Sequence, residues 1–297
     1  MRVLGLLPAL LLCSCVLLQA EDDPSWTTPI APFQIADNVF YVGSQDLASY
    51  LVVTPQGNIL INANLASSPP QIRASVEKLG FRWTDTRILL NSQAHFDHMA
   101  GAAQVVRETH AKNMVMEGDV SVVETGGRTD FLSPSANLPT YAALPVDRVL
   151  HDEDAVTLGG VTLTAHLTAG HTRGCTTWTM KSHLPGEPAG TTRNLVIVGG
   201  VGFWSEYHFV ATAGHPVSYP GIVNDFEHTF ATLLAMPCDV FLGAHGGYFN
   251  MESKLKRLAK EGPRVFVDPA GCRRFVEAAH ANFERELRKE KADSLRE

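Results

Sequence analysis

Apolar runs separated by polar turns predict two blocks of strands, each followed by helices. The first block has short β-type runs at 39–42, 50–53 and 58–61, with a turn at 54–57. Further strands are predicted at 87–90, 113–116, 155–158, 161–167, 176–180, 195–198 and 240–242. Helices are predicted at 69–79, with Ser68 as N-cap and Gly80 at the end, and at 99–109, 226–234 and 275–291. Two strand blocks favour two packed sheets with helices outside over one doubly wound sheet.

The first twenty residues have the pattern of an export signal. Arg2 is the only charged side chain before Glu21, the run 4–18 is mostly apolar, and Ala20 is a small residue at a plausible cleavage point. The apolar run is short for a membrane span. An uncleaved anchor and lipid attachment at Cys15 are the alternatives. We therefore expect a signal over 1–20, a periplasmic or secreted protein, and no stable membrane span after processing.

Composition narrows the class of protein. The 297 residues are 45% hydrophobic and 19% charged, which suits a chain with a large core. The formal net charge of -7 gives no overall attraction to nucleic acid or to anionic membranes. The chain has neither a dinucleotide-binding glycine motif nor a P-loop, so nucleotide binding has no motif support.

Export would leave three cysteines, Cys175, Cys238 and Cys272. In an oxidising compartment two of the three can pair. These residues alone do not decide between one pair and three free thiols.

Potential metal ligands gather just after predicted strands. The segment 92–98, SQAHFDH, follows the strand at 87–90 and holds His95, Asp97 and His98. If the segment stays extended, His95 and Asp97 project to one side and His98 follows on the turn into the helix. Imidazole and carboxylate are ligands that suit zinc. A hydrogen-bonded loop with solvated histidines is the alternative for this segment taken alone.

Two later segments favour the metal interpretation. His171 follows the strand at 161–167 in the sequence TAGHT, and His245 follows the strand at 240–242 in LGAHGG. Small neighbours let a side chain and a ligand approach closely. Three strand ends with the same chemistry predict one shared metal centre.

These segments together resemble the metallo-β-lactamase superfamily, and within it the subclass B3 enzymes. The resemblance rests on SQAHFDHMAG at 92–101, AHLTAGHTRGC at 165–175, and FAT at 230–232 followed by PCDV at 237–240. It covers roughly residues 33–290. It implies an αβ/βα sandwich, an α/β (α+β) fold of two mixed sheets with helices on both outer faces. One such domain over 21–297 then replaces the two domains suggested by length alone.

The resemblance also implies the site residues. The first metal site would be Gln93, His95 and His171, and the second would be Asp97, His98 and His245. Asp97 would also orient the nucleophile. Cys238 and Cys272 fall where the family carries a disulfide.

Three positions depart from the family pattern. Gln93 replaces a usual histidine, and its neutral amide is a poorer zinc donor than imidazole, although Gln occurs here in some subclass members. We therefore expect one or two zinc ions, with the second site tighter. Asn62 replaces an aspartate that supports the metal loop from outside the ligand set. Loss of such a supporting group typically lowers metal affinity or activity by about 10–100-fold. Gly199–Gly202 replaces a polar segment near the metals.

An aromatic stretch after these glycines is a candidate substrate-pocket wall, with Phe203, Trp204 and Tyr207 as its members. A loop packed on the core is the alternative. The remaining histidines of note, His166, His208 and His215, are expected to be structural or solvated.

The expected activity is hydrolysis of β-lactam antibiotics. A zinc-bound hydroxide would attack the amide carbonyl, because zinc lowers the pKa of bound water to about 7. A small-molecule substrate is the expected partner, and a monomer is favoured. The alternatives are hydrolysis of lactones or thioesters, or a zinc-binding relative with weak catalysis.

Overall fold

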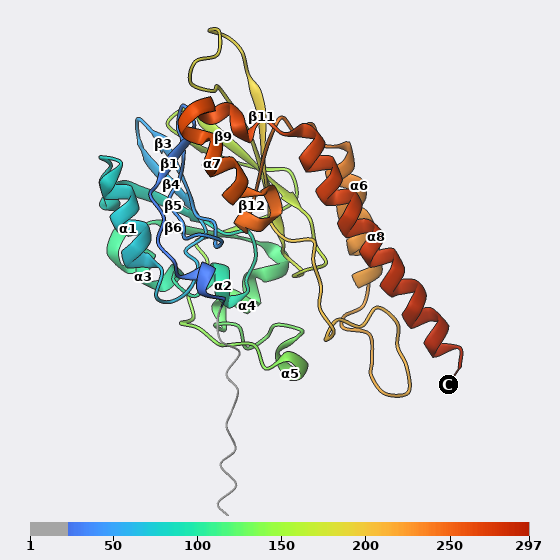
Figure 1. The fold of residues 1–297 in the computed structure, drawn as a ribbon. Helices are drawn as coiled ribbons and strands as arrows, with labels where there is room; N and C mark the ends of the chain where they lie inside the picture. The colour runs from blue at the N-terminus through green and yellow to red at the C-terminus, as the bar shows by residue number, and fades with distance from the viewer. Residues whose placement is uncertain (1–22, 297) are drawn as a thin grey trace, which may run out of the picture.

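Two β-sheets face each other across a shared hydrophobic core in the computed structural model, which describes residues 23–296 (Figure 1). The predicted signal at 1–20, with Cys13 and Cys15, lies outside the described residues. The first sheet has the strand order β1 (Phe33–Ala36), β2 (Val39–Tyr41), β3 (Tyr50–Thr54), β4 (Gly57–Ile61), β5 (Thr86–Leu90), β6 (Lys112–Met116) and β7 (Arg148–Leu150). Neighbouring strands are antiparallel from β1 to β4 and parallel from β4 to β7.

The second sheet is also mixed. Its strand order is β12 (Val240–Gly243), β11 (Arg193–Val198), β10 (Thr176–Ser182), β9 (Val161–Leu167) and β8 (Asp154–Leu158). Only β11 and β12 are parallel. The predicted sandwich of two mixed sheets with outer helices is confirmed.

Side-chain alternation explains why both faces of the first sheet are covered. In β4, Ile59 and Ile61 belong to the core between the sheets, whereas Leu60 points to the helices outside. The helices α1 (Pro69–Lys78) and α3 (Ala102–Thr109) contribute buried residues to this outer cluster. The helices α6 (Ile222–Ala235) and α8 (Pro269–Ser294) cover the second sheet (Figure 1). The remaining helices are η1 (Pro24–Trp26), η2 (Trp83–Asp85), α2 (Phe96–Met99), η3 (Glu117–Asp119), α4 (Val120–Glu124), α5 (Ser133–Ala136), η4 (Gly246–Phe249), α7 (Met251–Glu261) and η5 (Gly262–Phe266).

The structure corrects three local expectations. The helix predicted at 99–109 is split between α2 and α3, because the amide of Gly101 donates to the carbonyl oxygen of Asn64 at 2.9 Å instead of continuing the helix. Ser68 makes no side-chain cap, since α1 begins with two prolines that have no N–H to satisfy. The metal-loop segment is not extended through Asp97, because α2 begins at Phe96.

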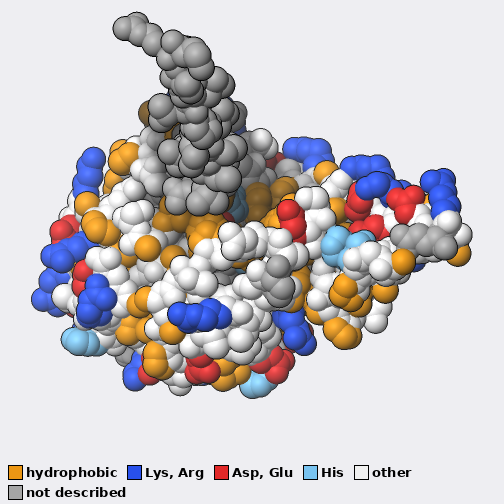
Figure 2. All heavy atoms as spheres, turned by 90° about the horizontal axis from the view of Figure 1, so that it is seen from below, with side chains coloured by type: hydrophobic (Ala, Val, Ile, Leu, Met, Phe, Trp, Pro, Cys, Tyr) orange, Lys and Arg blue, Asp and Glu red, His pale blue; other side chains and the backbone are white. Residues whose placement is uncertain are grey.

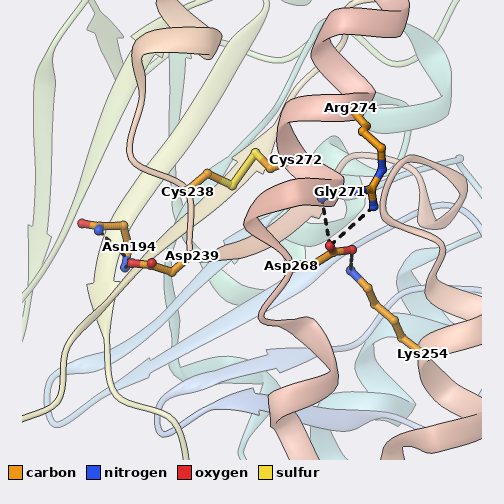
Figure 3. The surroundings of a disulfide bond; sticks show 8 residues. All are labelled: Asn194, Cys238, Asp239, Lys254, Asp268, Gly271, Cys272 and Arg274. Atoms are coloured by element: carbon orange, nitrogen blue, oxygen red, sulfur yellow. Dashed lines mark hydrogen bonds and ion pairs between the residues drawn. A yellow bond between two sulfur atoms is a disulfide. The ribbon is translucent and has the colours of Figure 1, made fainter.

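The beginning of α8 is fixed by several interactions (Figure 3). A disulfide joins Cys238, which precedes β12, to Cys272 in the first turn of α8. Asp268 caps the helix by accepting a hydrogen bond from the amide of Gly271 at 2.8 Å. The buried ammonium of Lys254 lies 3.2 Å from the same carboxylate. These bonds tie α8 to α7 and to the second sheet.

The far end of α8 is different. It protrudes from the body, and Figure 2 shows basic and acidic side chains mixed along it. Over residues 23–296 no helix combines the length and the apolar character needed to cross a membrane.

Candidate metal centre

Three strand ends bring the predicted ligands together at one edge of the sandwich. His95 follows β5 and is the N-cap of α2, His171 follows β9, and His245 follows β12. Local structure places Asp97 and His98 inside the short helix α2. The side chains of all these residues except His245 are almost fully buried.

The second predicted donor set is compact. Nε2 of His98 lies 3.2 Å from Nε2 of His245 and 3.1 Å from a carboxylate oxygen of Asp97. The same oxygen lies 3.4 Å from Nε2 of His245. Three donor atoms therefore converge on one point.

In the first predicted donor set, the two imidazoles approach each other in the same way. Nδ1 of His95 lies 3.2 Å from Nε2 of His171. The side-chain oxygen of Gln93 is buried and accepts no hydrogen bond from any residue in 23–296. A buried amide oxygen without a donor is costly unless another group satisfies it.

Both sets fit zinc. Bonds of about 2.0–2.1 Å in a tetrahedral arrangement separate two nitrogen ligands by about 3.3 Å. The two histidine pairs have nearly this separation. The buried oxygen of Gln93, which has no donor among residues 23–296, is of a type that can bind zinc as a third ligand.

Electrostatics prepare the second set for a cation. Burial alone would raise the pKa of Asp97, but the imidazoles of His98 and His245 hold it well below its usual range. Burial would lower the pKa of His245, whereas hydrogen bonds to Asp46 and Asp97 raise it to about 9. The Asp97 carboxylate is therefore ionised at the point where the second set converges, which favours a cation there.

The two histidines of the first set differ. Burial would lower the pKa of His95, but the hydrogen bond to Asp130 raises it. Burial and the neighbouring His95 lower the pKa of His171 to about 3. Its ring is therefore uncharged near neutral pH, which is the form that binds metal. Its Nδ1 donates to the carbonyl oxygen of Gly202 at 2.8 Å, and this bond leaves Nε2 free for a ligand.

Three acidic residues behind the ligands escaped the sequence interpretation. Asp46 accepts a hydrogen bond from Nδ1 of His245 at 2.7 Å. Asp130 lies 3.4 Å from Nε2 of His95. Asp119 accepts hydrogen bonds from backbone amides in the loop of His95 and in the loop of His171. Nothing in their local sequence marks them, because each acts on a residue far away along the chain.

Asp119 joins the loop of His95 to the loop of His171. One carboxylate oxygen accepts from the amide of Ala94 at 2.9 Å and from the hydroxyl of Thr172 at 2.8 Å. The other oxygen accepts from the amide of Gly174 at 2.8 Å. Burial raises the pKa of Asp119 to about 6, against the hydrogen bonds that lower it. This single buried side chain fixes the spacing of two first-set ligands.

The departures from the family pattern have local explanations. Asn62 accepts a hydrogen bond from the amide of Ser92 at 2.8 Å and donates to the carbonyl oxygen of Ala48. It therefore still supports the metal loop, but without a charge. At Gly200, an added Cβ would lie 2.8 Å from the ring of His171, so close approach requires glycine here.

A cavity of about 340 Å³ opens over both donor sets. Its apolar walls come from four separate segments: Trp26, Phe96, Leu138 and Trp204. Of the three predicted wall residues, Trp204 alone lines this cavity. Tyr207 belongs to the core cluster and Phe203 packs against that cluster, and the Tyr207 hydroxyl donates to the carbonyl oxygen of His171. Trp26 had not been predicted, because it lies in the N-terminal segment.

The other histidines lie away from this cavity. His166 makes hydrogen bonds to Glu153 and Thr179. His208 and His215 stack on each other with ring centroids 3.6 Å apart. His166 also forms an exposed group with Asp152 and Glu153, but its two ring nitrogens are already hydrogen-bonded.

Comparison with known proteins shows the family to which the chain belongs. The profile of the metallo-β-lactamase superfamily matches residues 47–183. The FEZ-1 metallo-β-lactamase from Legionella gormanii is 47% identical, with a TM-score of 0.84 over 89% of this chain and 98% of that one.

Two subclass B3 structures are also similar. BJP-1 of Bradyrhizobium japonicum is 32% identical, with a TM-score of 0.79 over 91% of this chain and 98% of that one. The di-zinc enzyme LRA-12 from an Alaskan soil metagenome is 32% identical, with a TM-score of 0.78 over 89% of this chain and 96% of that one. The chain therefore belongs to the metallo-β-lactamase superfamily, and the named relatives to which it is similar include members of subclass B3.

Proposed function

We propose that this protein is a zinc-dependent hydrolase that opens the β-lactam ring of β-lactam antibiotics. The observation that carries the proposal is the pair of donor sets that share one apolar cavity. The relatives at 47% and 32% identity over nearly their whole length are described as β-lactamases.

The residues would divide the work as follows. Gln93, His95 and His171 would hold one zinc ion, and Asp97, His98 and His245 the other. Bound zinc supplies Lewis acidity and lowers the pKa of water. Asp97 would also orient the attacking water by accepting its hydrogen bond. The walls around Trp26 and Trp204 would exclude bulk water and hold the substrate.

The second site should bind zinc more tightly than the first. It has the only carboxylate donor, and the carboxylate of Asp46 supports His245 at 2.7 Å from outside the ligand set. The first site has a neutral amide in place of an imidazole. Anomalous diffraction during a zinc titration should show the second site filling first.

The location of the protein rests on two features. The pattern at 1–20 is that of an export signal, and the disulfide between Cys238 and Cys272 suits an oxidising compartment. We infer a periplasmic or secreted protein, with residues 21–297 forming a single domain that acts as a monomer. Lipid attachment at Cys15 is the alternative to release.

Removal of zinc should abolish turnover. We expect the purified protein to hydrolyse a penicillin, a cephalosporin and a carbapenem, to lose this activity with a chelator, and to regain it with added zinc. Absorbance assays on the three substrates measure this directly. Turnover of a lactone or a thioester without turnover of any β-lactam, at saturating zinc, would contradict the proposal.

Restoring histidine at position 93 tests whether the first site is adapted or decayed. For Gln93→His we expect tighter zinc binding at the first site and only a modest change in turnover. Competition titration and steady-state kinetics measure the two effects. A large gain from near-zero activity would instead indicate a zinc-binding relative with weak catalysis.

A further inference from the structure

The segment that carries Trp204 has no regular secondary structure. It runs from residue 199 to 221, between β11 and α6, and we name it the wall loop. The Trp204 ring lies 5.6 Å from the rings of His95 and His171, measured between centroids, and its side chain is partly exposed. A cavity wall in an irregular loop needs other elements to hold it in place.

One part of the wall loop is held by the metal centre itself. The carbonyl oxygen of Gly202 accepts from His171, and the hydroxyl of Tyr207 donates back to the carbonyl oxygen of His171. The Tyr207 ring also packs edge-on against Trp204, with centroids 4.9 Å apart. These contacts fix the side of the loop nearest the ligands.

The next part of the loop is held by α8. The carboxylate of Glu290 accepts hydrogen bonds from the amides of Phe209 and Val210, at 2.7 and 2.8 Å. Two consecutive backbone N–H groups on one carboxylate oxygen make a charge-assisted anchor. Glu290 lies in the protruding end of α8, which Figure 1 shows beside this loop.

An aromatic cluster connects the same two elements. The ring of Phe283 on α8 lies 5.0 Å from that of Phe209 and 5.0 Å from that of Phe226 on α6. Phe203, which precedes Trp204, packs against Phe209 with centroids 5.1 Å apart and against Phe283 with centroids 6.5 Å apart. The loop is therefore pinned to α8 on both sides of Trp204 and Tyr207, while the disulfide fixes the other end of the helix.

We propose that Glu290 is a positioning residue for the substrate wall, and that the protruding end of α8 serves to hold Trp204 over the metal centre. The inference rests on the proposed function for its kinetic consequence. Glu290 touches no substrate. It acts through the backbone of the wall loop, so its loss should weaken substrate binding more than the chemical step.

Three variants of the full zinc-loaded protein test this. Glu290→Ala removes the acceptor. Glu290→Gln keeps an acceptor oxygen without the charge. Glu286→Ala is the matched control, because this neighbouring acid on α8 pairs with Lys289 at 2.7 Å. Hydrogen–deuterium exchange of peptides covering 203–218, kcat and KM for a penicillin, and zinc content are measured for each.

In Glu290→Ala we expect exchange at Phe209 and Val210 to rise by roughly ten- to a hundred-fold, the factor for loss of a charge-assisted hydrogen bond. KM should rise by about ten-fold on the same reasoning, with kcat changed less and zinc content unchanged. Glu290→Gln should recover most of both effects, and Glu286→Ala should resemble the parent protein.

Unchanged exchange in the wall loop, an unchanged KM, or an equal effect from Glu286→Ala would overturn the proposal. If the parent protein hydrolyses no β-lactam, the proposed function fails. The exchange measurement alone then decides whether Glu290 anchors the loop.

Discussion

Replacing Asp97 with Ala will lower β-lactam turnover by roughly a thousand-fold, within the range for loss of a group that orients a proton in the reaction. Asp97 is the only anionic donor of the two sets, and its carboxylate lies 3.1 Å from Nε2 of His98 and 3.4 Å from Nε2 of His245. Without it, two neutral imidazoles remain to hold the second zinc. The variant should therefore also bind less zinc at the second site.

The matched control is Asp152→Ala, which removes an acid from the exposed group around His166. Steady-state kinetics and zinc content per chain, measured at saturating and at limiting zinc, separate the two effects. Full turnover by Asp97→Ala would remove Asp97 from the reaction. A similar loss in Asp152→Ala would point to a general effect on folding.

Replacing Asp119 with Ala should lower the free energy of unfolding by about 3–5 kcal/mol, because it leaves three donors buried without an acceptor at about 1–3 kcal/mol each, with partial relaxation. The three donors belong to Ala94, Thr172 and Gly174, on two different loops. The spacing of His95 and His171 depends on this junction, so zinc affinity at the first site should fall as well.

Chemical denaturation of the zinc-free protein measures the stability, and competition titration measures zinc affinity. Asp147→Ala is a fitting control, since this more exposed carboxylate bonds only Lys112 and the amide of Asn113. The Asp147→Ala variant should lose far less free energy of unfolding and should keep the zinc affinity of the parent protein. Parent-like stability and zinc affinity in Asp119→Ala would show that the two loops keep their spacing without this junction.

Secondary structure was predictable from the sequence where a clear local pattern of apolar and polar residues marks the element. The strands with regular alternation of apolar and polar residues, such as 161–167, and the amphipathic helices were predictable from period alone. The strands β1 and β7 were missed because three or four residues show no clear alternation. The helix α7 was missed as well, although its eleven residues MESKLKRLAKE are rich in helix formers.

Within the site, the same distinction holds. His95, Asp97 and His98 stand in one short segment, and together with His171 and His245 after two other strands they predicted a metal centre from the sequence alone. Gln93 as a ligand came from the resemblance. The split of that segment between two donor sets came from the resemblance, and its geometry comes from α2, which turns Asp97 and His98 away from His95 and toward His245.

The sequence by itself therefore determined the ligand types, the strand ends that carry them, and the layered fold. Only the tertiary structure decided which acids support the ligands and which elements build the cavity. Asp46 and His245 are 199 positions apart, and Glu290 meets Phe209 across 81 positions. Such pairs depend on how helices and sheets pack, and packing contacts between distant segments leave no periodic signal along the chain.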